Sequence, residues 1–461
     1  MLADTYALGA ATGVEGPLLF LKRTVNVGLN QAVEIEETEG TSRLGYIAAQ
    51  DEDTITVEVM DATRGMSLAD TRVRFHGERL QFAVGPDILG RVFDGVGRVI
   101  DGGPQISATK TFNIDGLAIN PAMRASPTDF IETGISTIDI MNSLVRGQKL
   151  PIFSGSGLPH DELAIQIAHQ SRLRGSDVGD FAIVFAAIGV PYDTAERFRR
   201  AMESSGALEH TALFLNLASD SSTQRLLTPR YALTAAEYLA FVEGRHVLVI
   251  MTDMTNYCEA LREVAASHGV VPSRKGFPGY MYSDLATLYE RAGSIKEVPG
   301  SLTQLPILTM PSDDITHPIP DLTGYITEGQ IVLDRVLDRA DIYPPVKVLP
   351  SLSRLMKDGT GENFTHPDHP ALANQLYAAY ARAVHVRVLA SVVGREGLAE
   401  IDQLFLDFGD RFEQQLVHQK GARTLEQSMQ AGWELLRALP VTELTRLDDE
   451  QIKQHITAKP E

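Results

Sequence analysis

Residues 150–166, LPIFSGSGLPHDELAIQ, constrain the fold of this chain more than any other stretch. A short apolar run enters a turn rich in Gly and Ser, and an amphipathic run follows. This order predicts a strand, a tight loop and a helix. It is the outline of a phosphate-binding loop, in which backbone N–H groups at the start of a helix cradle phosphate oxygens. The outline therefore predicts an α/β domain with a parallel sheet.

The side chains that make such a loop work are missing. The working pattern, GxxxxGK[ST], supplies a Lys that neutralises phosphates and a hydroxyl that holds Mg²⁺. Here Ser154 stands at the first Gly position and Pro159 at the second, while His160 replaces the Lys and Asp161 the hydroxyl. Proline removes a backbone donor, histidine is ordinarily neutral at pH 7, and aspartate brings negative charge beside phosphates. We expect a degenerate loop that keeps its shape and does not bind nucleotide. It consists of Ser154, Gly155, Ser156, Gly157, Leu158, Pro159, His160 and Asp161.

Neighbouring strands offer no replacement for the missing groups. A hydrolytic site also needs a carboxylate that polarises water, and the strand FAIVFAAIGV ends on Val190, which cannot accept a proton. Asp253, at the end of VLVIMTD, either supports Mg²⁺ or caps a strand end. In THPDHP, His366 and His369 resemble a ligand cluster, but the prolines indicate a turn instead. We predict no metal site and no nucleotide hydrolysis by this chain alone.

The composition argues against two classes of function. The chain has 461 residues, with 41 Lys and Arg against 60 Asp and Glu, and a formal net charge of −19. Nucleic-acid binding is disfavoured as the main activity, because affinity for phosphate backbones comes from clustered cations. No basic segment precedes an apolar run at the start, and the longest apolar runs reach roughly half the ~20 residues of a membrane helix. With a single cysteine, Cys258, these features predict a cytoplasmic protein that meets a membrane only through partners.

The pattern of the sequence predicts three domains. Residues 1–75 alternate apolar and polar positions between turn signals, as in a small all-β barrel. Residues 76–350 are expected to form the central domain. This domain opens with a Gly-rich hairpin at 90–101 and then alternates strands and helices, as in a doubly wound α/β domain. Residues 351–461 have helical periodicity. Expected strands are 18–21, 32–35, 44–48, 54–59 and 73–75, then 150–153, 180–187, 211–215, 247–252 and 305–309. Expected helices are 162–174, 193–204, 232–243 and 281–291, then 371–390, 401–416, 424–439 and 441–456.

A second functional candidate lies in RADIYPPVKVLPSLSRLMKDG, at 339–359. Its prolines favour a rigid, extended path, and Ser351, Ser353 and Arg354 follow on an expected loop-to-helix turn. A guanidinium on a stiff segment is what an arginine finger needs, because it is always charged and can hold two phosphate oxygens. The alternative is an ordinary surface ion pair, and the pattern alone leaves both open.

Long segments, in fixed order, resemble one family. The chain is similar over nearly its whole length to the B subunits (beta chains) of V-type and archaeal-type rotary ATPases. The segments that carry the resemblance are IDGLAINPAMR at 114–124, FIETGISTIDIMNSLVRGQKLPIFSGSGLPHDELAIQI at 130–167, RLLTPRYALTAAEYLAF at 225–241, VLVIMTDMTNYCEALREV at 247–264, PGYMYSDLATLYERAG at 278–293 and PPVKVLPSLSRLM at 344–356.

The resemblance implies a fold and an assembly. It implies an N-terminal β-barrel, a central RecA-like domain of the phosphate-loop NTPase class and a C-terminal helical domain. It implies a ring of three B and three catalytic A subunits around a central rotor shaft, with peripheral stalk subunits outside. Such a complex couples ATP synthesis or hydrolysis to rotation and ion transport across a membrane.

The resemblance also implies where the chemistry lies. Mg-ATP or ADP binds at the A–B interface, with the working loop on A, and the B subunit is non-catalytic and regulatory. The B subunit supplies an arginine finger in trans, and the matching position is Arg354. Tyr325, Ser351 and Ser353 match segments that approach the same interface.

Two residues depart from the family pattern, and two other functions fit the residues less well. Lys347 and Asp161 stand where many B subunits carry Asn. Lys347 could alter packing behind the finger, and Asp161 makes phosphate binding at the loop still less favourable. A self-sufficient NTPase would need a cation and a base that the loop lacks. A hexameric nucleic-acid motor would need an aromatic and basic stripe, which residues 1–75 lack.

Overall fold

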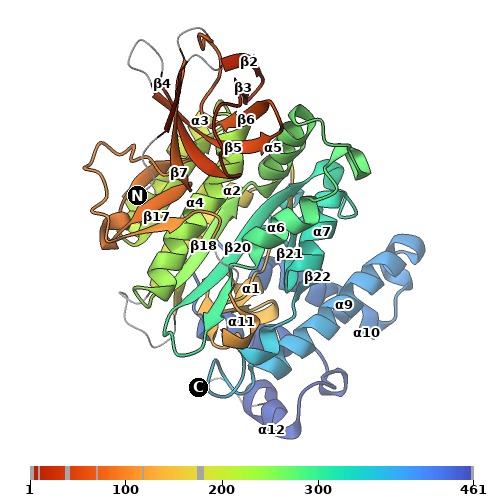
Figure 1. The fold of residues 1–461 in the computed structure, drawn as a ribbon. Helices are drawn as coiled ribbons and strands as arrows, with labels where there is room; N and C mark the ends of the chain where they lie inside the picture. The colour runs from red at the N-terminus through yellow and green to blue at the C-terminus, as the bar shows by residue number, and fades with distance from the viewer. Residues whose placement is uncertain are drawn as a thin grey trace. The chain divides into compact units, whose positions relative to one another are not determined.

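The computed structural model describes residues 5–8, 11–36, 42–68, 71–116, 119–173 and 181–457. The chain forms two compact units, each built from two separate segments (Figure 1). The first unit comprises Met1–Asn120 and Ala182–Arg291, and the second comprises Pro121–Phe181 and Ala292–Glu461.

The first unit begins with a seven-stranded antiparallel sheet in the order β1-β7-β4-β5-β6-β3-β2. Side chains alternate along its strands; in β4, for example, Val33 and Ile35 are fully buried while their neighbours are partly exposed. The buried side chains form one apolar core, and all five expected strands of this region are confirmed. The strands are β1 Thr5–Leu8, β2 Ala11–Glu15, β3 Leu18–Lys22, β4 Gln31–Glu36, β5 Ser42–Gln50, β6 Thr54–Val59 and β7 Arg72–Arg79.

The rest of the first unit is α/β. Its parallel strands lie in the order β18-β16-β17-β9, and their continuous apolar runs are buried on both faces. An antiparallel bridge between Phe93 and Val99 confirms the turn expected at 90–101. The strands are β8 Gln81–Val84, β9 Val92–Asp94, β10 Lys110–Asn113, β16 Phe181–Val190, β17 Thr211–Leu217 and β18 His246–Thr252. The helices are α3 Tyr192–Ser205, α4 Ser222–Phe241, α5 Met254–Ser267 and α6 Met281–Tyr289.

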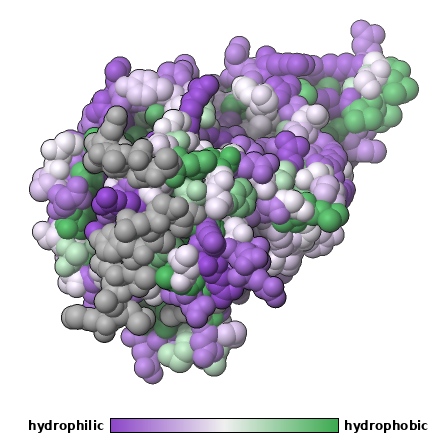
Figure 2. Space-filling model, turned by 45° about the horizontal axis from the view of Figure 1, so that its top comes forward, coloured by the Kyte–Doolittle hydropathy of each residue, from purple (hydrophilic) through white to green (hydrophobic). Residues whose placement is uncertain are grey.

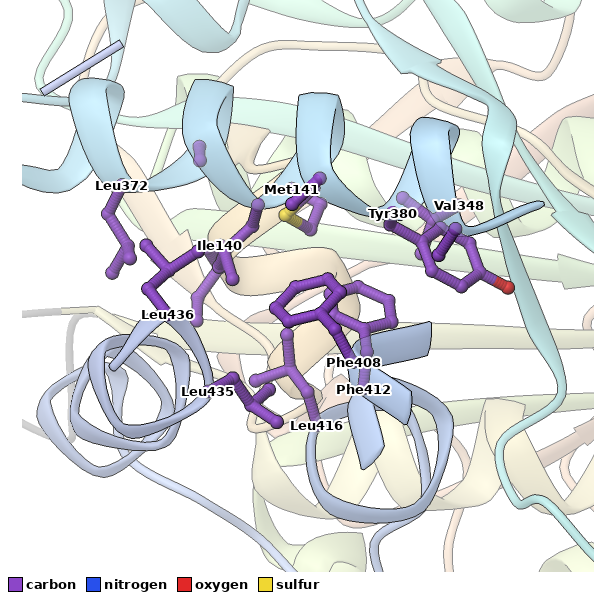
Figure 3. Packing of buried hydrophobic residues seen from close by; sticks show 14 of the residues in the cluster. Ile140, Met141, Val348, Leu372, Tyr380, Phe408, Phe412, Leu416, Leu435 and Leu436 are labelled. Atoms are coloured by element: carbon purple, nitrogen blue, oxygen red, sulfur yellow. The ribbon is translucent and has the colours of Figure 1, made fainter. Parts of the chain in front are cut away.

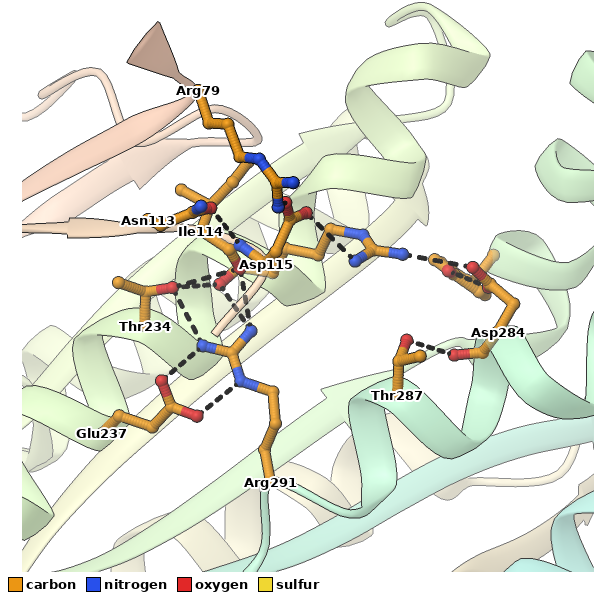
Figure 4. A network of polar contacts seen from close by, with 11 residues as sticks. Arg79, Asn113, Ile114, Asp115, Thr234, Glu237, Asp284, Thr287 and Arg291 are labelled. Carbon is orange, nitrogen blue, oxygen red and sulfur yellow. Dashed lines mark hydrogen bonds and ion pairs between the residues drawn. The ribbon is translucent and has the colours of Figure 1, made fainter. Parts of the chain in front are cut away.

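A buried arginine joins three segments of this unit (Figure 4). Arg291, 2% exposed, donates to both carboxylate oxygens of Glu237 at 2.7 Å. It also donates to the Ile114 carbonyl and the Thr234 hydroxyl, at 3.0 Å each. A buried guanidinium needs such a full set of acceptors, because an unpaired buried charge is strongly destabilising. At Gly116, φ is +67° and an added Cβ would lie 2.6 Å from the Arg291 guanidinium carbon, so only glycine fits there.

The second unit contains the degenerate loop and the strands around it. Its main strands lie in the order β22-β21-β14-β20, with β14 parallel to β20 and to β21, and β22 antiparallel to β21. The strands are β11 Arg124–Ala125, β12 Phe130–Glu132, β13 Leu144–Val145, β14 Ile152–Gly155, β15 Arg172–Leu173, β19 Gly293–Ile295, β20 Ser301–Met310, β21 Gly329–Leu333 and β22 Val346–Ser353. The helices here are α1 Ser136–Met141, α2 His160–Gln170, α7 Pro318–Ile326 and α8 Arg335–Arg339.

The second unit ends in helices, which share one apolar core with α1 and β22 (Figure 3). In that core Tyr380 stacks on Phe412, with ring centroids 4.4 Å apart. The helices are α9 His369–Val393, α10 Glu400–Phe412, α11 Leu425–Leu436 and α12 Asp449–Gln451. Among the described helices only α9 is long and apolar enough to span a membrane by composition, and its buried face packs against α1, α10 and α11.

Three helix predictions are wrong in their bounds. The helix expected at 162–174 ends at Gln170, because residues 172–173 pair with β12 as a strand; Arg174 lies outside the described residues. The helix expected at 232–243 begins ten residues earlier, at Ser222, and continues through Pro229. The continuous helix expected at 441–456 is broken into short turns around α12. The predicted fold class is confirmed: a sheet-rich N-terminus, a central α/β region and a helical C-terminus.

Candidate functional site

Arg354 lies directly after the last residue of β22 and is exposed. Its backbone N–H donates to the Glu328 carbonyl at 2.9 Å, and its Nη1 donates to the Thr327 carbonyl at 3.3 Å. Both acceptors belong to the two-residue connection between α7 and β21. The side chain therefore starts from a fixed backbone position and projects toward solvent.

The prediction of a loop-to-helix turn at Ser351 and Ser353 is wrong, because both residues belong to β22. Pairing with β21 extends the strand despite the prolines, and Pro350 lies where the register between the two strands is irregular. Both serines are buried, and each hydroxyl donates to a backbone carbonyl of this chain. Ser351 donates to the Lys347 carbonyl at 2.6 Å, and Ser353 donates to the Ser143 carbonyl at 2.8 Å.

Tyr325 and Arg354, far apart in the sequence, line the same shallow surface pocket of about 220 Å³. Tyr325 is on α7 and is 73% exposed, which is unusual for a tyrosine on a helix that is otherwise half buried. An exposed aromatic ring beside an exposed guanidinium suits a contact with another molecule. The pocket is lined by Phe153, Ile315, Pro320, Asp321, Gly324, Tyr325, Gln330 and Arg354.

The degenerate loop has the predicted strand, turn and helix, but two of its backbone donors face inward. The Leu158 N–H donates to the Gly155 carbonyl at 3.1 Å, and the His160 N–H donates to the Leu158 carbonyl at 2.8 Å. The His160 ring lies back on the loop, with Nδ1 3.1 Å from the Ser154 hydroxyl. Its Nε2 lies 3.6 Å from an Asp161 carboxylate oxygen. Two backbone donors of the loop, at Leu158 and His160, are thus engaged within the loop itself.

An ion pair also covers the loop, and sequence reasoning missed it. Arg335 binds both carboxylate oxygens of Asp313, at 2.9 and 3.0 Å, and donates to the Ser156 carbonyl at 2.9 Å. The Asp313 oxygen lies so close that a Cβ added to Gly155 would be 2.2 Å from it. The hydrogen bond from Arg335 holds the pKa of the Asp313 carboxyl below its usual range, so the carboxylate is charged. No motif links the two residues in the sequence.

The other candidates have structural partners. Asp253 is the N-cap of α5 and accepts a hydrogen bond from the Thr255 N–H at 2.8 Å. Of the two roles considered for Asp253, Mg²⁺ support and capping of a strand end, this contact fits the capping role. His369 is fully buried, with Nε2 3.0 Å from the Ile140 carbonyl. Cys258 is buried in α5, where burial raises the pKa of its thiol. Among the described residues, no group of three or more His, Cys, Asp or Glu is arranged to hold a metal ion.

Lys347 lies on the strand that precedes Arg354 and binds an acidic neighbour. It is half exposed on β22, and its ammonium binds the Asp334 carboxylate, which also caps α8. The departure from the family pattern at this position therefore adds a surface ion pair.

Three family models match the chain. They are the beta-barrel domain of the ATP synthase alpha/beta family at residues 11–77, the nucleotide-binding domain of that family at 134–353, and the C-terminal domain of V and A type ATP synthase at 358–456. Together they cover most of the sequence, in the order that the architecture requires.

Similar proteins carry matching names. The V-type ATP synthase beta chain of Halothermothrix orenii is 53% identical over 99% of this chain and 98% of its own length. The B 1 subunit of the A-type ATP synthase of Methanospirillum hungatei is 53% identical over 96% of each chain. A solved structure, the ATP synthase subunit NeqB of Nanoarcheaum equitans, superposes with a TM-score of 0.74 at 38% identity, over 92% of this chain and 100% of that one. The chain therefore belongs to the ATP synthase alpha/beta family, among the B subunits (beta chains) of V-type and A-type ATP synthases.

Proposed function

We propose that this chain is the non-catalytic, regulatory B subunit of the headpiece of a V/A-type rotary ATP synthase, and that Arg354 acts as an arginine finger in trans. The observation that carries the proposal is the exposed guanidinium at the end of β22, beside the exposed Tyr325, in a chain whose own loop is blocked. In this assignment three B subunits alternate with three A subunits, and Mg-ATP or ADP lies at the A–B interface.

The residues of this chain would act as follows. The Arg354 guanidinium compensates the negative charge that develops on the transferred phosphoryl group, and it needs no proton transfer to do so. Tyr325 supplies apolar area and a hydroxyl next to the guanidinium. Ser351 and Ser353 are buried, so they act by holding the end of the strand rather than by touching nucleotide.

The C-terminal helices offer a surface for the rotor shaft. The end of α9 and the start of α10 carry exposed apolar side chains: Val388, Leu389, Val392, Val393 and Leu404. Apolar side chains gather at the right-hand end of the face in Figure 2. Isolated exposed apolar residues are ordinary, but a group of this size on one helix end indicates a contact surface. We assign it to the shaft, place the peripheral stalk subunits outside the ring, and place the chain on the cytoplasmic side, held at the membrane through the complex.

The arginine finger is tested by Arg354→Ala in a reassembled complex. We expect ATP turnover to fall by ~10³-fold or more, because fingers contribute about that much to phosphoryl transfer. Ring assembly, measured by native mass, should stay at the wild-type level, because the side chain makes its one described hydrogen bond to a backbone carbonyl. Arg200→Ala, at an exposed position on α3, is the control and should change neither quantity. Wild-type turnover in the Arg354 variant would refute the assignment.

A self-sufficient NTPase is the alternative, and it predicts turnover by the purified chain. The inward donors and the Asp313–Arg335 pair argue against it. We expect no steady ATP hydrolysis by the chain alone.

A further inference from the structure

The backbone at Arg354 depends on one short connection. Both described hydrogen bonds of Arg354 go to carbonyls of Thr327 and Glu328, between α7 and β21. Whatever fixes these two residues also fixes the point from which the guanidinium projects. Because an arginine side chain is long, a small shift at its base becomes a larger shift at its tip.

Glu328 is held by Lys149 through three contacts. The Lys149 ammonium lies 2.7 Å from Oε1 of Glu328, and the Lys149 backbone N–H donates to Oε2 at 2.9 Å. In return, the Glu328 N–H donates to the Lys149 carbonyl at 3.1 Å. The side chain of Lys149 is only 7% exposed and that of Glu328 is 28% exposed, so the ion pair is partly desolvated. Lys149 enters the strand that leads into the degenerate loop, at a bridge to Gln304.

A second residue ties the same connection to the end of β22. The Gln148 side-chain amide donates to the Glu328 carbonyl at 3.3 Å and to the Ser353 hydroxyl at 3.0 Å. Its oxygen accepts from the Val145 N–H at 3.0 Å. Gln148 is fully buried, and every contact is made to a group that cannot easily move. Ser353 precedes Arg354 in the chain, and Glu328 accepts the hydrogen bond from the Arg354 N–H. Ser353 is bound by Gln148, and Glu328 is bound by both Gln148 and Lys149.

We infer that the half-buried Lys149–Glu328 ion pair, with Gln148, is a positioning device for Arg354, a role that rests on the proposed function of that residue. None of these three residues lines the pocket that contains Arg354 and Tyr325. They act by holding the connection that sets the guanidinium in place, so the strand that leads into a blocked loop has a use in catalysis at a neighbour's site. A finger must reach developing charge with little error, because a misplacement of about 1 Å can cost ~10²-fold in rate.

The test uses the reassembled complex with Glu328→Ala and, separately, Lys149→Met. We expect kcat to fall by ~10–100-fold with the KM for Mg-ATP unchanged, because a finger acts on the transition state and a displaced one is lost there first. Glu328→Gln, which removes the charge but keeps an oxygen acceptor for Lys149, should recover part of the rate. Lys347→Met is the matched control: it breaks an ion pair on β22 that does not contact the 327–328 connection, and kcat should stay at the wild-type level.

A double variant separates positioning from general damage. The Arg354→Ala variant reacts slowly, so its rate is measured by single-turnover cleavage of labelled ATP. Adding Glu328→Ala to this variant should cause no further loss of rate. A further loss equal to that in the wild-type background would overturn the inference, as would wild-type kcat in both single variants. If Arg354→Ala itself retained turnover, the proposed function would fail instead, so the two failures can be told apart.

Discussion

At the scale of single residues, Asp313 and Arg335 support the expectation that the loop does not bind nucleotide. Among the described contacts, Arg335 is the cation that reaches the loop, through the Ser156 carbonyl. Its charge is compensated by the bidentate contact with Asp313. An incoming phosphate would have to displace that carboxylate and then meet Asp161 as well.

We predict that Asp313→Asn allows anion binding at the loop. The freed Arg335 would bring the affinity for inorganic phosphate into the millimolar range, where about 1 mM corresponds to ~4 kcal/mol of binding. Calorimetric titration of the purified chain measures this, and the wild-type chain should show no heat of binding. Asp410→Asn is the control: it breaks an exposed ion pair between Asp410 on α10 and Arg387 on α9, and the variant should not bind phosphate. Equal binding by both variants would contradict the prediction.

At the scale of elements, the close approach of β21 and β22 sets the position of the site. Gly329 has φ +137°, and a Cβ at this position would lie 2.0 Å from the Leu352 carbonyl oxygen. Gly329 pairs with Ser353, the residue before Arg354. Any side chain here would push the end of β22 away from β21, and the guanidinium would move with it.

We predict that Gly329→Ala destabilises the chain by more than ~2 kcal/mol, because backbone strain is added to a steric clash with another strand. Urea unfolding of the purified chain gives this free energy. Gly206→Ala is the matched control: Gly206 also has a positive φ, at the end of α3, but nothing lies within 4 Å of an added Cβ. That variant should cost only about 1–2 kcal/mol, the strain of the left-handed conformation alone. Equal losses in both would show that the clash is relieved without cost.

At the scale of the whole molecule, charge and exposed apolar side chains decide which kind of neighbour the surface suits. With a formal net charge of −19 and exposed apolar side chains at the end of α9, the surface suits protein neighbours rather than nucleic acid. Val392, 80% exposed, and Val388, 63% exposed, are the residues of that helix end that solvent reaches most.

We predict that the double variant Val388→Asp with Val392→Asp uncouples the assembled complex. ATP turnover should persist, because Arg354 is untouched, while ATP-driven ion transport into membrane vesicles falls by roughly tenfold, the effect of ~1.4 kcal/mol of lost contact. Val271→Asp, at a position 83% exposed on the other compact unit, should leave both quantities unchanged. Parallel loss of turnover and transport would instead indicate a defect in assembly.

Features that depend on neighbouring residues could be predicted from the sequence alone. The strand, turn and helix of the loop, the alternation of the N-terminal strands and the helical C-terminus all follow from local periodicity, and the structure contains each of them. The local motif left the role of Arg354 open, and the family resemblance selected it; its exposed location agrees with that choice without testing its role.

Contacts between distant residues were settled only by tertiary packing. Lys149 and Glu328 are 179 residues apart, and Arg335 reaches the loop across the same separation. Ser351 and Ser353 are in a strand because β21 lies beside them. Such pairings depend on how the packed chain brings its surfaces together, and no local pattern of residue types encodes that arrangement.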